Sequence, residues 1–213
     1  MKVVVVMHTP EEPAELLGEA LEANGAEVEV IKVYETDHLA RPASATHLVL
    51  LGGPMSVHDT AIFPFIEEEQ QVIRNFVASG RPVLGICLGA QQIAVAFGGA
   101  VTKSVEEIGW REIAGDGQVF PDRFMAFQLH GETFSVPAEG TLLCRGEQVE
   151  NQGFRYKCAL GLQFHLEMTP ERIEALTIDS PPAEQAAIRR ERRLYAGQGH
   201  QLYRRVTDLF LSL

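Results

Sequence analysis

The chain has 213 residues, of which 46% are hydrophobic and 22% are charged, which is the balance of an ordinary globular protein. Its 18 basic and 29 acidic residues leave a net charge of −11, so the electrostatic field of the molecule repels phosphate backbones and anionic lipids. We therefore expect neither a nucleic-acid partner nor a membrane partner. The apolar runs are also far shorter than the roughly 20 residues that span a bilayer.

The N-terminus and the cysteines indicate the compartment. Only five apolar residues lie between Lys2 and His8, fewer than the apolar core of a secretory signal requires. The three cysteines are odd in number and widely spaced, which argues against a disulfide framework. We predict a reducing, cytoplasmic setting.

The first half of the chain alternates between strand and helix patterns. Runs rich in Val, Ile and Leu predict strands over residues 2–8, 47–51 and 82–86, and Val28, Val30 and Val33 indicate another. Segments with one apolar face and a following glycine predict helices over 13–24, 64–79 and 88–97. This order predicts an α/β fold: a doubly wound, mostly parallel sheet with helices on both faces.

The second half contains shorter segments separated by turns. We expect a small set of antiparallel strands against the sheet edge, over residues 101–104, 108–113, 123–129, 141–145 and 154–164. From residue 169 the pattern is helical, with a break at Pro181 and Pro182. The arginine-rich stretch 189–193 is predicted to be a solvated helix face, with a docking surface for an acidic partner as the alternative. Without repeats or linkers, residues 1–213 are predicted to be one domain.

The segment from Gly85 to Gly89, Gly-Ile-Cys-Leu-Gly, lies where a predicted strand meets a predicted helix. It has the Gly-x-Cys-x-Gly form of a nucleophile elbow, in which the glycines make room for a sharp turn. The start of the helix lowers the pKa of a thiol placed there, and the N–H of Leu88 would face a developing oxyanion. We predict that Cys87 is a nucleophile. The alternative, a small buried hydrophobic residue, is what we expect of Cys144 and Cys158.

A thiol nucleophile needs a base and a group that orients the base. His165 and Glu167 follow an apolar run, 165 − 87 = 78 residues after Cys87. In an extended chain, side chains two positions apart share a face, so the carboxylate of Glu167 could hold the imidazole of His165 while its other nitrogen meets the sulfur.

Four motifs together resemble the class I glutamine amidotransferases, particularly stand-alone members similar to the glutaminase domain of GMP synthase. They occur in the family's order and cover most of residues 1–170: Gly52–Val57, Gly85–Gln91, His130–Phe134 and Gln163–Glu167. The resemblance implies a Cys-His-Glu triad that releases ammonia from the glutamine side chain, or hydrolyses a related γ-glutamyl amide, through a γ-glutamyl thioester.

The resemblance also assigns the residues of such a site. The triad would be Cys87, His165 and Glu167, and the oxyanion-hole N–H donors would belong to Gly53 and Leu88. The substrate-binding positions would be Gly52, Gln91 and His130. A lone histidine after a strand is as often a capping or hydrogen-bonding residue, so both interpretations of His130 stay open.

The sequence departs from the family pattern at two positions. Leu166 stands where the family usually has proline, which removes a fixed φ angle but keeps the catalytic spacing. Glu132 stands where the family usually has aspartate, and its extra methylene could change which γ-glutamyl compound the pocket accepts.

No cofactor or metal is expected. The loop at Gly52 lacks the Gly-Lys-Ser/Thr of a phosphate-binding loop. The other histidines form no ligand spacing and are predicted to be surface or core residues: His8, His38, His47, His58 and His200.

Several functional alternatives remain open. The 213 residues leave no room for a synthase domain, so the chain is either the glutaminase subunit of a complex, passing ammonia to a synthase subunit, or a free-standing γ-glutamyl hydrolase. A protease or chaperone-like protein of the intracellular-protease family would need a histidine soon after the cysteine, where Ala90 and Gln91 stand. A non-catalytic regulatory homologue is the third alternative.

Overall fold

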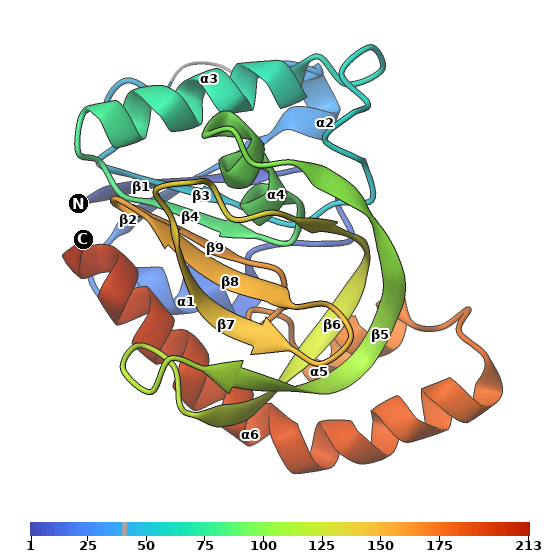
Figure 1. The fold of residues 1–213 in the computed structure, drawn as a ribbon. Helices are drawn as coiled ribbons and strands as arrows, with labels where there is room; N and C mark the ends of the chain where they lie inside the picture. The colour runs from blue at the N-terminus through green and yellow to red at the C-terminus, as the bar shows by residue number, and fades with distance from the viewer. Residues whose placement is uncertain (40–41) are drawn as a thin grey trace.

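The computed structural model describes residues 1–39 and 42–213, apart from the side chains of Ala196, Gln198 and His200. Its strands are β1 (Lys2–Met7), β2 (Glu27–Lys32), β3 (His47–Leu50), β4 (Val83–Ile86), β5 (Val101–Gly115), β6 (Arg123–Phe134), β7 (Thr141–Gly146), β8 (Asn151–Tyr156) and β9 (Ala159–Leu162). Its helices are α1 (Glu15–Ala23), α2 (Val33–Thr36), α3 (Phe65–Ala78), α4 (Leu88–Ala96), α5 (Pro170–Leu176) and α6 (Pro182–Ser212). Within the described residues, the strands form one sheet in the order β2-β1-β3-β4-β9-β8-β7-β5-β6 (Figure 1).

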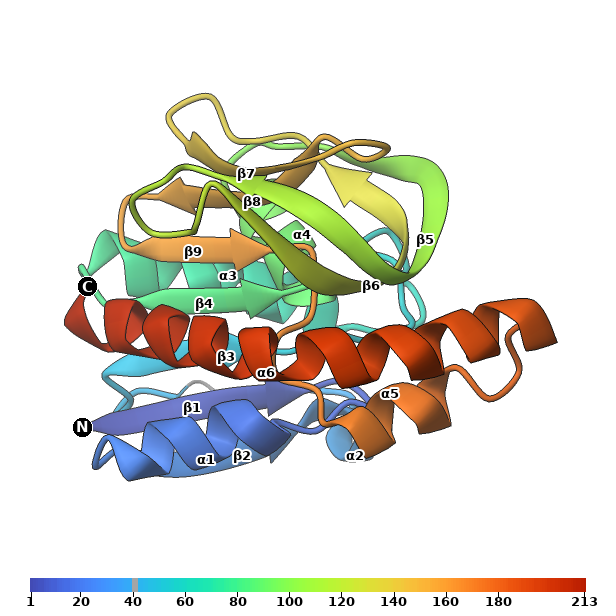
Figure 2. The ribbon, with the colours of Figure 1, turned by 90° about the horizontal axis from the view of Figure 1, so that it is seen from below.

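The parallel half of this sheet comprises β2, β1, β3, β4 and β9. The valines of β1 are fully buried and alternate between its two faces. Val3 and Val5 pack in the core under α1 and α6, whereas Val4 and Val6 pack in the core under α3 and α4. Helices therefore cover both faces of the sheet (Figures 1 and 2), and the predicted doubly wound fold is confirmed.

The antiparallel half differs in four ways from the sequence prediction. Segments 101–104 and 108–113 form one strand, β5, with an irregularity between Lys103 and Glu107, and β6 continues past residue 129 to Phe134 because its end pairs with Val101. Segment 154–164 contains a turn between β8 and β9, at which Lys157 has a φ of 52°. Strand β9 pairs in parallel with β4 and so lies within the sheet rather than at its edge.

The C-terminal residues form two helices separated at Pro181, as predicted. Helix α6 crosses the α1 face of the sheet, as Figure 2 shows. Arg189 and Arg192 form ion pairs with Glu174 of α5 at 3.1 and 2.8 Å, and Arg190 and Arg193 are exposed, as expected for a solvated helix face. Within residues 1–39 and 42–213, no helix has the length and apolar character needed to cross a bilayer.

The parallel strands bring four distant segments to one edge of the sheet. Because β1, β3, β4 and β9 run in the same direction, the residues that follow them meet at their carboxyl ends. These residues are His8, Gly52 and Gly53, Cys87, and the segment 163–167.

Candidate active site

Cys87 lies at the turn between β4 and α4, where the sequence predicts an elbow. Its backbone has a φ of 49° and a ψ of −106°, a combination that residues with a side chain rarely adopt. A Cβ atom on Gly85 would collide with the backbone of Gly89, and a Cβ atom on Gly89 would collide with the carbonyl group of Leu50. The two glycines are therefore required by the close approach of the turn to its neighbours.

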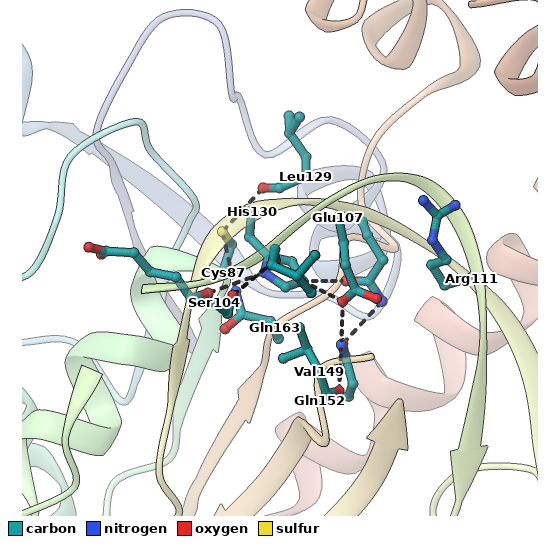
Figure 3. A network of polar contacts seen from close by, with 12 residues as sticks. Cys87, Ser104, Glu107, Arg111, Leu129, His130, Val149, Gln152 and Gln163 are labelled. Carbon is teal, nitrogen blue, oxygen red and sulfur yellow. Dashed lines mark hydrogen bonds and ion pairs between the residues drawn. The ribbon is translucent and has the colours of Figure 1, made fainter. Parts of the chain in front are cut away.

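The Cys87 side chain is 7% exposed and has two polar neighbours (Figure 3). Its Sγ donates to the carbonyl oxygen of Leu129 over 3.8 Å and accepts from Nε2 of Gln163 over 3.7 Å. Gln163 opens the motif that ends at Glu167, yet the sequence analysis assigned it no role.

The other cysteines have different surroundings. Burial raises the pKa of the Cys144 thiol and, more mildly, that of Cys158. Both thiols therefore stay protonated at neutral pH, as expected for cysteines that fill the core.

His165 and Glu167 are brought together immediately after β9. Nδ1 of His165 lies 2.7 Å from Oε1 of Glu167, and both residues are buried. The main-chain N–H of His165 donates to the carbonyl oxygen of Phe127 over 2.9 Å, which ties the segment to β6. The N–H of Leu166 donates to Oε2 of Glu167 over 2.9 Å, a bond that a proline could not make. The departure at Leu166 thus adds a support for the carboxylate.

The protonation of His165 is set by its neighbours. Burial opposes the charged form, but the carboxylate of Glu167 and the sulfur of Cys87 outweigh it, so the pKa of His165 is raised well above its ordinary value. Nε2 of this ring is buried and has no hydrogen-bond partner among the described residues. Catalytic hydrogen bonds often form only when substrate is bound, and Nε2 is the nitrogen left for proton transfer.

The Gly52–Gly53 segment passes closely between His165 and the start of α4. A Cβ atom on Gly52 would collide with the carboxylate of Glu12 and lie 3.1 Å from Cε1 of His165. One on Gly53 would lie 3.2 Å from Cδ2 of Leu88, the first residue of α4. Gly53 and Leu88, the two residues predicted to supply the oxyanion-hole N–H groups, therefore lie next to each other in space.

Glu12 is a second carboxylate near His165, in addition to Glu167, and the sequence analysis missed it. Burial, with a smaller contribution from Glu167, raises the pKa of Glu12, and the nearby His165 only partly offsets this effect. No motif marks Glu12, because it lies in the loop after β1, far from His165 in the sequence.

A cleft of about 280 Å³ opens beside Cys87. Its walls come from the Gly-Gly-Pro loop, the elbow and β6: Gly53, Pro54, Met55, Ser56, Asp59, Cys87, Gln91, Leu129, His130, Gly131 and Glu132. Oγ of Ser56 donates to Oε1 of Glu132 over 3.2 Å, which joins two walls. Nε2 of Gln91 donates to the carbonyl oxygen of Glu132 over 3.3 Å. Gly52 is not among the lining residues; its carbonyl group faces His8.

The ring of His130 is buried in the cleft wall (Figure 3). Nδ1 lies 3.1 Å from the carbonyl oxygen of Glu132, and Nε2 lies 3.1 Å from both Oε2 of Glu107 and Oε1 of Gln128. Glu107 also accepts from Nε2 of Gln152 over 3.0 Å. His130 therefore lines the cleft with its ring held inside the wall, by a carboxylate that the sequence analysis missed.

His8 is a second histidine with a buried carboxylate partner. It follows β1, and its Nε2 lies 3.0 Å from Oε1 of Glu69 in α3, with both side chains fully buried. Of the two environments predicted for His8, surface or core, the structure shows the core. Among the described residues, no group of three or more His, Cys, Asp or Glu side chains is arranged to hold a metal ion.

The sequence of the chain matches the family model described as glutamine amidotransferase class-I over residues 13–179. It is 30% identical over 186 residues to the GMP synthase of Chlorobium phaeovibrioides. This alignment covers 79% of the present chain and 34% of the GMP synthase. It is also 30% identical to the glutamine amidotransferase-like protein YfeJ of Salmonella typhimurium, over 98% of this chain and 89% of that protein. The chain spans about a third of the length of the GMP synthases that it matches.

Solved structures resemble the whole chain. A glutamine amidotransferase from Thermotoga maritima has a TM-score of 0.91 at 28% identity and covers 100% of this chain and 99% of its own. One from Methylobacillus flagellatus has a TM-score of 0.91 at 25% identity, over 99% and 94% of the two chains. Since the family model matches well over half of the sequence, the chain belongs to the class-I glutamine amidotransferase family.

Proposed function

We propose that the protein hydrolyses the side-chain amide of glutamine, or of a related γ-glutamyl compound, through a γ-glutamyl thioester on Cys87. The observation that carries the proposal is the position of Cys87: a strained elbow residue at the base of a cleft, beside a buried imidazole that a carboxylate orients. Family membership supports the same chemistry.

The first half of the proposed reaction forms the thioester. The thiolate of Cys87 attacks the amide carbon, and the N–H groups of Gly53 and Leu88 stabilise the resulting oxyanion. Each such donor contributes on the order of 3 kcal/mol to transition-state stabilisation. The imidazolium of His165 donates its Nε2 proton to the leaving nitrogen, which departs as ammonia. The raised pKa of His165 supports this role, because it keeps the proton on the ring until the leaving group takes it.

The second half hydrolyses the thioester. Neutral His165 accepts a proton from water, and the hydroxide attacks the thioester carbon. The tetrahedral intermediate expels the Cys87 thiolate and releases glutamate, which restores the thiolate and the imidazolium. Glu167 holds Nδ1 throughout and stabilises the charged ring.

The charge of the cleft supports an amino-acid amide as substrate. Two carboxylate residues, Asp59 and Glu132, line the cleft, and no lysine or arginine does so among the residues that the structure describes. Such a lining favours a substrate with an ammonium group, as the α-amino end of a γ-glutamyl compound has.

The test is to incubate the purified chain with glutamine and a panel of γ-glutamyl amides and to measure ammonia or amine release. Cys87→Ala should abolish release, whereas Cys158→Ala, a matched change at a thiol outside the cleft, should retain it. A glutamine-mimicking electrophile should label Cys87. Full activity of Cys87→Ala, or labelling of Cys144 or Cys158 in place of Cys87, would contradict the proposal.

The same assay separates the free-standing enzyme from a subunit that supplies ammonia to a synthase. Turnover by the chain alone favours a free-standing hydrolase, and turnover that begins only when a synthase subunit is added favours the complex. The experiment with an added synthase subunit is included because the chain matches only 34% of the GMP synthase from Chlorobium phaeovibrioides. Absence of both turnover and labelling favours a non-catalytic homologue.

A further inference from the structure

His8 lies directly behind the Gly-Gly-Pro loop. Its ring is fully buried, and Nδ1 lies 3.1 Å from the carbonyl oxygen of Gly52. Its Cβ would be only 2.9 Å from a Cβ on Gly53, so the histidine is packed against both glycines. His8 does not line the cleft and cannot contact substrate there.

The bond to Gly52 acts on Gly53 through the geometry of the peptide group. The carbonyl oxygen of Gly52 and the N–H of Gly53 belong to one planar, trans peptide unit, so they point in opposite directions. Fixing the oxygen on one side therefore fixes the direction of the N–H on the other. Glycines on both sides of this unit leave its rotation little hindered by side chains, so an external anchor has a large effect here.

Both nitrogens of His8 face acceptors. A carbonyl oxygen can only accept, so Nδ1 must carry the proton of its bond to Gly52. Nε2 faces Oε1 of Glu69 at 3.0 Å, and Oε2 of the same carboxylate accepts from Nε2 of Gln92 over 3.0 Å. A doubly protonated ring satisfies both contacts, and it offsets the charge of a carboxylate that would otherwise be buried unpaired. Burial lowers the pKa of His8, but Glu69 and the Gly52 carbonyl raise it further, and the net shift is upward.

The carboxylate partner connects His8 to the second oxyanion donor. Gln92 belongs to α4, the helix that begins at Leu88, and its Oε1 accepts from Gln70 of α3 over 3.0 Å. The chain of bonds from Gly52 through His8, Glu69 and Gln92 therefore joins the Gly53 peptide to the helix that carries the Leu88 N–H. One buried network sets the position of both donors relative to each other.

We propose that His8, held by Glu69, is a positioning residue of the oxyanion hole: it anchors the Gly52 carbonyl so that the Gly53 N–H points at the developing oxyanion. The inference rests on the proposed function for its kinetic consequence. The orientation of the peptide itself depends only on the buried contacts.

The experiment uses two substitutions that each keep one end of the ring. In His8→Asn, the side-chain nitrogen replaces Nδ1 and can still donate to Gly52; in His8→Gln, it replaces Nε2 and can reach only Glu69. His8→Gln should lower kcat at least about tenfold with little change in KM, because one donor of the oxyanion hole is worth on the order of 100-fold or more. His8→Asn should retain at least several-fold more kcat than His8→Gln. His38→Gln is the matched control, since His38 forms an exposed pair with Glu68 at 2.8 Å.

Alkylation of Cys87 by iodoacetamide, followed by peptide mapping, separates positioning from general damage. This displacement forms no oxyanion, so its rate should be unchanged in His8→Gln. An unchanged kcat in His8→Gln would overturn the proposal. A parallel fall of kcat and alkylation rate would also overturn it, because the substitution would then have disturbed the whole site.

A second readout requires no turnover. In the wild type, nitrogen NMR of the His8 ring should find Nδ1 protonated, and the amide signal of Gly53 should move more in His8→Gln than in His8→Asn. An unprotonated Nδ1 overturns the inference even if the variants do not fold. If the wild type hydrolyses none of the amides, the proposed function fails, and these signals alone decide whether His8 orients the peptide.

Discussion

Nδ1 of His165 and Oε1 of Glu167 are 2.7 Å apart, and the single residue between them helps to hold that distance. The N–H of Leu166 binds the other oxygen of Glu167, so the carboxylate is fixed at both oxygens. The side chain of Leu166 is buried in the core beneath, which keeps this segment from moving away. His165 and Glu167 are therefore held together in one turn after β9.

Glu167→Gln tests this relationship. The amide can keep the shape of the side chain but removes the charge, so the pKa of His165 should fall toward its ordinary value. The kcat should drop by about 100-fold or more, because the imidazolium loses its stabilising partner. Proton NMR of His165 and ammonia release measure the two effects. An unchanged pKa would mean that Glu167 does not set the protonation of the ring.

The strained backbone of Cys87 predicts an unusual order of stability. At a φ of 49° and a ψ of −106°, a residue with a side chain costs of order 1–3 kcal/mol, which glycine avoids. Cys87→Gly should therefore have a free energy of unfolding about 1 kcal/mol or more above that of Cys87→Ala. Urea denaturation of the two inactive variants makes the comparison. The reverse order would show that this backbone is not strained in solution.

The packing around the elbow predicts that a side chain at Gly89 lowers the stability of the fold. In Gly89→Ala, the new methyl group would collide with the carbonyl group of Leu50 in β3, which should lower the free energy of unfolding by about 1–3 kcal/mol. In Gly197→Ala on helix α6, the methyl group meets no atom of the described residues within 4 Å, so this variant should be more stable by about 0.5–1 kcal/mol. Thermal or urea unfolding of both variants checks the contrast, and equal effects would contradict the close approach.

The contact between Ser56 and Glu132 predicts a change of selectivity. Glu132→Asp shortens the side chain by one methylene, which should break the 3.2 Å bond across the cleft and widen its edge. The kcat/KM for a bulky substrate such as γ-glutamyl-p-nitroanilide should then rise relative to that for glutamine, by about threefold to tenfold. Ser56→Ala should change the ratio in the same direction, since it removes the other partner of the bond. Opposite shifts in the two variants would indicate that the bond does not set the cleft edge.

The buried pair of His8 and Glu69 predicts a pH dependence of stability. The pKa of His8 is raised in the folded chain, so its stabilising effect is complete below about pH 6.5, the ordinary value, and is lost as the pH rises through the folded value. The free energy of unfolding should therefore fall above pH 6.5, with a slope of at most about 1.4 kcal/mol per pH unit for this proton. In Glu69→Gln the slope should be smaller, because His8 then loses the carboxylate that raises its pKa. Urea midpoints between pH 6 and pH 9 provide the test; an equal slope in the variant would contradict it.

The sequence predicted best those features that local patterns encode. The valine run of β1 and the two glycines around Cys87 each carry a physical requirement within a few residues, so the parallel strands and the elbow were predicted. The turn at Lys157 escaped prediction because it lacks the usual turn residues: a lysine adopts the left-handed backbone there. The placement of β9 beside β4 depends on packing between distant segments, which no local pattern records.

The candidate site shows the same contrast between features with a local pattern and features without one. The motifs marked Cys87, His165 and Glu167, but the residues that support the cleft from behind have no motif of their own. Glu69 and Glu107 read as ordinary polar positions in the sequence, yet each is buried against a histidine. Their partners come from other elements, so only the folded arrangement identifies them.

The parallel pairing of β4 with β9 makes the order of synthesis matter. Cys87 is translated well before strand β9 and His165, and the whole antiparallel ribbon of β5 to β8 lies between them in the sequence. Under the proposed function, a nascent chain that ends before β9 carries Cys87 without the imidazole proposed to activate it. The nucleophilic reactivity of this thiol should therefore appear only once β9 has joined the sheet, so that reactivity reports completion of the fold.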